Sequence, residues 1–75
     1  MTSTPEVRRS HIDLGEAARQ LELAIHDARV AYDCMALGNL DRAHTHAITA
    51  RTEADAAETI LRAALGPAAS AAGDM

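Results

Sequence analysis

The chain has 75 residues, with 11 acidic and 7 basic side chains, a formal net charge of −4 and one cysteine, Cys34. A chain of this length forms one domain at most, and its core supplies only a few kcal/mol of net stability. Its acidic balance argues against a nucleic-acid partner, which requires clustered positive charge. A single cysteine cannot form an internal disulfide, so we expect a reducing, cytoplasmic compartment. No apolar run approaches the ~20 residues that span a bilayer, so no membrane partner is expected.

The turn residues divide the chain into two helices. The first is predicted over residues 13–37, because Gly38-Asn39 is the next pair after this run that favours a helix end. The second is predicted over residues 40–65, where Gly66-Pro67 combines a C-terminal glycine with a residue that cannot continue a helix. A two-residue break leaves only an antiparallel arrangement of neighbouring helices. The predicted fold class is therefore all-α, an antiparallel two-helix hairpin.

The two ends of the chain carry weaker signals. Residues 1–10 are expected to form a frayed or capping N-terminal segment, because Ser3-Thr4-Pro5-Glu6 and Ser10 both resemble helix starts. Residues 67–75 are small and lack a large apolar anchor, which predicts a flexible tail. The hairpin domain is then residues 11–66.

Apolar residues recur in steps of three and four along both helices, which is the spacing of a seam between helices. In the first helix and just before it, this row consists of Val7, His11, Leu14, Ala18, Leu21, Ile25, Ala28, Tyr32 and Met35, and His11 is its one polar member. In the second helix they are Leu40, Ala43, Ala47, Ala50, Ala54, Ala57, Leu61 and Ala64. Ala17, Ala24 and Ala31 repeat every seven residues beside the first seam and would let a neighbouring backbone approach closely. We expect the centres of the two seams to be buried against each other, namely Leu21, Ile25, Ala28, Ala47, Ala50, Ala54 and Leu61.

A second apolar stripe predicts association. Leu23, Val30 and Leu37 lie about 140° around the first helix from its main seam. An alanine-lined contact buries too little apolar surface to offset the entropy of ordering two helices. We therefore predict that the hairpin dimerises into a four-helix bundle. The predicted interaction surface consists of Leu23, Val30, Leu37, Ile48 and Ile60.

The sequence gives no catalytic, cofactor-binding or metal-ligating assignment. His44 and His46 stand two residues apart and therefore about 200° apart on a helix, so they cannot grip one metal together. His26 is interpreted as a surface partner of Glu22, and Cys34 as a small buried hydrophobe. The four glycines are isolated, so no phosphate loop is predicted, and no cofactor is expected.

Part of the chain resembles a tetratricopeptide repeat. Tyr32, Leu37-Gly38-Asn39-Leu40, Ala43 and Ala50 are similar to the turn and second helix of that repeat, where a glycine and spaced alanines allow tight packing. The resemblance covers one hairpin whose helices are longer than those of the family, and no second copy follows. It therefore implies tight hairpin packing and does not imply peptide binding by a repeat array.

The functional prediction is a small non-catalytic protein–protein interaction or regulatory module that acts as a helical-bundle homodimer. Its expected partners are a second copy of the chain and a larger protein. The alternative is a ligand-binding or catalytic bundle whose site forms at the subunit interface from His26, His44 or His46 and nearby acids. A third reading makes the chain a subunit of an obligate hetero-complex.

Overall fold

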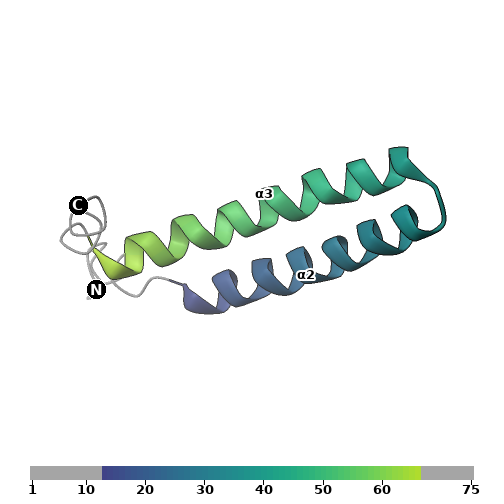
Figure 1. The fold of residues 1–75 in the computed structure, drawn as a ribbon. Helices are drawn as coiled ribbons and strands as arrows, with labels where there is room; N and C mark the ends of the chain where they lie inside the picture. Colours follow the sequence, from purple (N-terminus) through teal and green to yellow (C-terminus); the bar gives the residue numbers. More distant parts are fainter. Residues whose placement is uncertain (1–12, 67–75) are drawn as a thin grey trace.

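The computed structural model describes residues 13–66 as a hairpin of two antiparallel α-helices (Figure 1). Helix α2 spans Leu14–Ala36 and helix α3 spans Leu40–Leu65. The helices lie side by side along their length and are joined by a tight turn at one end (Figure 1). The predicted all-α hairpin is confirmed, and both helices begin and end within one residue of their predicted bounds. The predicted segments 1–10 and 67–75 lie outside the described residues.

Side-chain and backbone caps fix the helix ends. The Glu16 backbone N–H donates to Asp13 Oδ1 at 3.0 Å, and the Arg42 backbone N–H donates to Asn39 Oδ1 at 3.2 Å, so each helix starts with a capping carboxylate or amide. At the end of α2, Asn39 N–H donates to the Cys34 carbonyl at 2.8 Å, and Gly38 adopts a positive φ of 82°. A left-handed glycine with this hydrogen-bond pattern is the Schellman ending of a helix. The chain therefore reverses direction at the predicted position.

The two helices meet through alanine. The buried residues of the described part are Ala17 and Ala24 on α2 and Ala43 and Ala57 on α3, and Ala57 is the least exposed at 1%. Half-buried positions continue the three-four spacing on both helices, namely Gln20, Asp27, Ala31, Cys34, His46, Ala50, Glu53 and Ile60. We call this contact the hairpin seam. Small side chains every seven residues on both helices let the backbones approach closely.

The rotation of the helices differs from the prediction. Of the seven residues expected to be buried, Leu21, Ile25, Ala28, Ala47, Ala54 and Leu61 are exposed, and Ala50 is half-buried. The prediction is therefore wrong for six of them. On α2 the seam lies one residue earlier, at Ala17, Ala24 and Ala31, which corresponds to a rotation of about 100°. The physical reason is that the smallest side chains allow the closest approach of the two helices, which leaves the larger ones facing outward.

Candidate functional site

The large apolar side chains gather on one outward face of the hairpin. Ala28, Tyr32 and Met35 of α2 line a shallow groove together with Leu40, His44 and Ala47 of α3. Positions seven residues away lie on the same side of each helix, so Leu14, Leu21 and Ile25 extend this surface along α2 and Leu61 extends it along α3. We call this surface the apolar face, made of Leu14, Ala18, Leu21, Ile25, Ala28, Tyr32 and Met35 on α2 and of Leu40, Ala47, Ala54, Leu61 and Leu65 on α3.

Exposure on this face is high for side chains of this size. Ile25 is 57% exposed, Met35 is 55% exposed and Tyr32 is 67% exposed. The groove near the turn has a volume of about 370 Å³ and an almost entirely apolar lining. None of the seven α2 residues of the apolar face is charged. Contiguous apolar surfaces are uncommon on monomeric proteins and are typical of interaction sites.

The predicted interaction surface lies on another part of the molecule. Val30 and Ile60 are half-buried in the hairpin, and Leu23 is 36% exposed, so this stripe borders the seam. Leu37 at the turn is 84% exposed and Ile48 is also exposed. The structure therefore does not bring these five residues into one exposed patch, whereas it does so for the apolar face. Whether they contact a partner stays a prediction.

The seam itself holds a polar cluster. His46 Nδ1 and Asp27 Oδ1 are 2.9 Å apart, with side-chain exposures of 29% and 14%. Glu53, one heptad after His46 on α3, has a buried carboxyl oxygen, Oε1, without a hydrogen-bond partner. Asp27, His46 and Glu53 thus form a group of three ionisable side chains between the helices.

The two acids of this cluster are shifted in opposite directions. The hydrogen bond from His46 holds the pKa of Asp27 below its ordinary value of 3.8. Loss of water, followed by the neighbouring Asp27 carboxyl, raises the pKa of Glu53 above its ordinary value of 4.5. A protonated Glu53 can donate to the Asp27 carboxylate, whereas an ionised Glu53 places a second negative charge beside it. Glu53 therefore holds its proton more tightly than an exposed glutamate does.

The cluster can hold and exchange a proton, which is chemistry available to a general acid or base. The nearest sulfur nucleophile in the seam is Cys34, which is half-buried. No group of three or more His, Cys, Asp or Glu residues within 13–66 has the geometry of a metal site. His26 and His44 are exposed, but His26 lies near the cluster, where its smaller contribution acts to lower the pKa of both the Asp27 and the Glu53 carboxyls.

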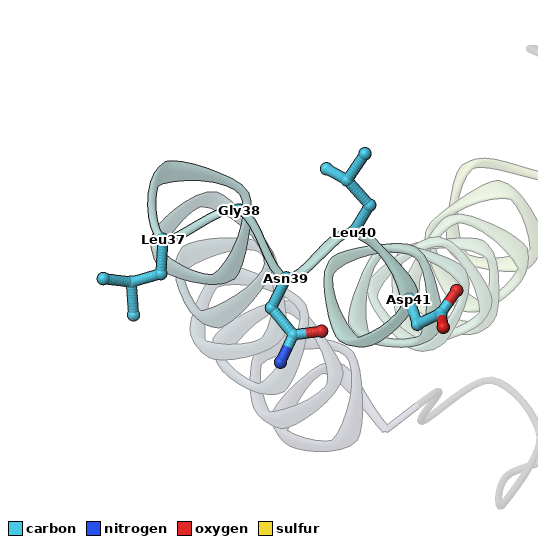
Figure 2. Close-up of a pocket in the computed structure, with 5 residues that line it drawn as sticks. All are labelled: Leu37, Gly38, Asn39, Leu40 and Asp41. Carbon is cyan, nitrogen blue, oxygen red and sulfur yellow. The ribbon is translucent and has the colours of Figure 1, made fainter.

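Another depression lies at the turn, lined by residues 37–41. Figure 2 shows that Leu37 and Leu40 point outward in different directions, while the Asn39 amide is turned toward the start of α3. The lining residues are engaged in capping or directed to solvent, and the depression is open. It therefore fits a helix connection better than a ligand site.

Sequence reasoning missed the Asp27–His46–Glu53 cluster. The available signal was that Gln20, Asp27 and Cys34, and likewise His46, Glu53 and Ile60, are seven residues apart and alternate with the heptad alanines. In an antiparallel hairpin that turns at Gly38, these two rows face each other. The prediction places the larger apolar rows in the seam and gives Asp27 and Glu53 no role there.

Neither described helix is long and apolar enough to cross a bilayer. Comparisons of the chain with protein-family models, with curated proteins and with solved structures found no significant match.

Proposed function

We propose that the chain is a small non-catalytic protein–protein interaction or regulatory module that acts in the cytoplasm as a homodimer, with two hairpins forming a four-helix bundle. The main support for this proposal is the distribution of apolar side chains. In the described residues the buried hydrophobic side chains are four alanines, whereas eleven large hydrophobic side chains are exposed. A helical hairpin of this kind gains little from its own seam and much from a partner that covers its outer face.

The polar cluster strengthens this argument. Asp27, His46 and Glu53 occupy positions in the hairpin seam that apolar side chains would fill in a self-sufficient pair of helices. Burying polar groups without full hydrogen bonding costs free energy, and Glu53 Oε1 lacks a partner. The free energy that holds the helices together must therefore come from another surface. A second copy on the apolar face supplies it.

Light scattering tests this function directly. The particle in solution should have twice the 7.9 kDa mass of one chain. Leu21→Glu places a charge on the apolar face and should yield monomers with reduced helical circular dichroism, because the new carboxylate cannot be buried at a contact. The matched control is Thr52→Glu, at an exposed position of α3, which should remain a helical dimer. A folded wild-type chain at the mass of one copy would contradict the proposal.

A second candidate is a ligand-binding or catalytic bundle, and the Asp27–His46 hydrogen bond favours it. His46 and its two acidic neighbours provide a proton donor and acceptor in a half-buried setting. A small molecule that uses this cluster would raise the melting temperature of the wild-type chain but not that of a His46→Ala variant. An equal rise in melting temperature for the wild type and for His46→Ala would contradict this second candidate function.

A further inference from the structure

We propose that two copies of the chain pair α2 against α2 in antiparallel orientation, about a two-fold axis that passes close to Ile25. The apolar face of each hairpin then covers that of the other, and the two turns lie at opposite ends of the bundle. This inference rests on the homodimer proposed above and adds the surface and the orientation of the contact.

The α2 part of the apolar face is self-complementary in size. Ala18 and Tyr32 lie seven residues on either side of Ile25, so antiparallel pairing sets the alanine of one copy against the tyrosine of the other. Leu21 and Ala28 lie four residues before and three residues after Ile25, and they pair in the same way. Large side chains opposite small ones interdigitate, which is how helix interfaces reach the density of a protein interior.

On α3, Arg51 lies one heptad after His44, which lines the groove, so Arg51 borders the apolar face. Because Ala28 and Ala47 line the groove from opposite helices, Ile25 is level with Ala50 and Arg51. The same two-fold axis therefore brings the Arg51 side chains of the two copies near each other, and their repulsion offsets part of the free energy that the apolar contact contributes.

In this arrangement the second copy also fills the groove near the turn. Because the turns lie at opposite ends, the open end of the second hairpin reaches the groove. Leu14 of the second copy then comes to Met35, which lines it. The alternative two-fold pairing, with both turns at one end and α2 over α3, sets Ala28 against Ala47 and Ile25 near Arg51. That pairing faces alanine with alanine in the groove, whereas the pairing of α2 with α2 sets large side chains against small ones.

The extent of the surface matches a second copy. Its eight largest residues are Leu14, Leu21, Ile25, Tyr32, Met35, Leu40, Leu61 and Leu65, each at least 40% exposed. At roughly 100 Å² of apolar surface each they offer on the order of 800 Å². A stable interface of standard size buries ~800 Å² per partner. The stripe of Leu23, Val30 and Ile60 offers less, because the seam already covers part of it.

Site-directed cross-linking tests the orientation with variants that preserve apolar packing. In a Cys34→Ala background, Ile25→Cys should form a disulfide-linked dimer on mild oxidation, because residues on the two-fold axis meet their own copies within the reach of a disulfide. Leu14→Cys alone and Met35→Cys alone should remain uncross-linked, whereas an equimolar mixture of the two should cross-link. A mixture of Leu21→Cys and Ala28→Cys provides an independent pair. Val30→Cys, off the apolar face, is the control and should stay uncross-linked.

The outcomes separate this inference from the function on which it rests. A dimer that cross-links at Ile25 and in both mixtures supports both. A dimer that cross-links at Val30 but not at Ile25, or through Leu14→Cys alone, overturns the orientation and leaves the homodimer intact. A wild-type chain that is monomeric and helical under reducing conditions overturns both, because no second copy then covers the apolar face.

Discussion

At the scale of single residues, the hairpin seam combines alanines with ionisable side chains. Ala17, Ala24 and Ala57 bring the helices together, and Asp27 and His46 are joined across the seam by a 2.9 Å hydrogen bond. Half-burial changes the proton affinities of the acids in this cluster, so their ionisation is linked to folding. Small side chains allow the close approach, and the same closeness shifts the pKa values of Asp27 and Glu53.

Glu53→Gln should change the pH dependence of stability. The pKa of Glu53 is raised in the folded chain by loss of water and by the neighbouring Asp27 carboxyl, so the folded state binds this proton more tightly than the unfolded state. That contribution to stability is present at low pH and is lost as pH rises from the ordinary glutamate value through the raised one. Glutamine mimics the protonated acid and keeps a donor for Asp27.

The melting temperature of Glu53→Gln should therefore exceed that of the wild type by an amount that grows as the pH rises above the ordinary glutamate pKa of 4.5 and through the raised pKa of Glu53. Glu58→Gln is the control, because Glu58 is exposed, pairs with Arg62 at 2.6 Å and has its pKa lowered by that hydrogen bond. Its substitution should give no such growing gain. Parallel melting curves for Glu53→Gln and wild type across this range would contradict the assignment.

Ala57→Leu should destabilise the hairpin. Ala57 is 1% exposed in the seam, so a larger side chain forces the helices apart at an overpacking cost of about 1–3 kcal/mol. Ala36→Leu, at the exposed end of α2, adds the same atoms outside the seam. Chemical denaturation should show a lower free energy of unfolding for the first variant and almost none of this loss for the second. Equal effects of the two would show that the seam is not closely packed.

At the scale of helices, the residues at which each helix begins and ends follow from local chemistry, whereas the rotation of each helix about its own axis does not. Gly38 and Gly66 both adopt positive φ, and Asn39 caps α3, as their residue types predict. The side of α2 that faces α3 could not be predicted from spacing, because two neighbouring rows of α2 both recur in steps of three and four. Sequence spacing identifies a row of apolar residues that is expected to be buried. Whether the other helix of the hairpin or a second protein buries that row depends on how closely the two backbones can approach.

Gly38→Ala should destabilise the turn through the backbone alone. Gly38 has φ of 82°, and no atom lies within 4 Å of the position that a Cβ would take. The cost is therefore the left-handed conformation itself, about 1–2 kcal/mol. The control is Gly15→Ala within the first turn of α2, where the new Cβ meets Asp13 Oδ1 at 3.3 Å and the helix gains from alanine. Thermal unfolding should show a larger loss for Gly38→Ala, and a larger loss for Gly15→Ala would contradict this reading.

At the scale of the whole molecule, we propose that folding and association are coupled. The seam buries alanine and polar groups, while Ile25, Tyr32 and Met35 face outward with more than half of their surface exposed. The small size of the chain and its alanine-rich seam predict a partner, and this partner stays a prediction. The surface proposed for it differs between the sequence and the structure, because the choice of surface depends on the rotation of α2.

Thermal unfolding at a series of chain concentrations tests the homodimer most directly. For a dimer whose hairpins are stable only together, the melting temperature rises with concentration, and a hundredfold increase shifts the balance by about 2.7 kcal/mol. For a chain of this length the account therefore predicts a melting temperature, followed by circular dichroism, that rises by roughly 10 °C or more over a hundredfold range. A cooperative transition at the same temperature throughout that range would contradict it.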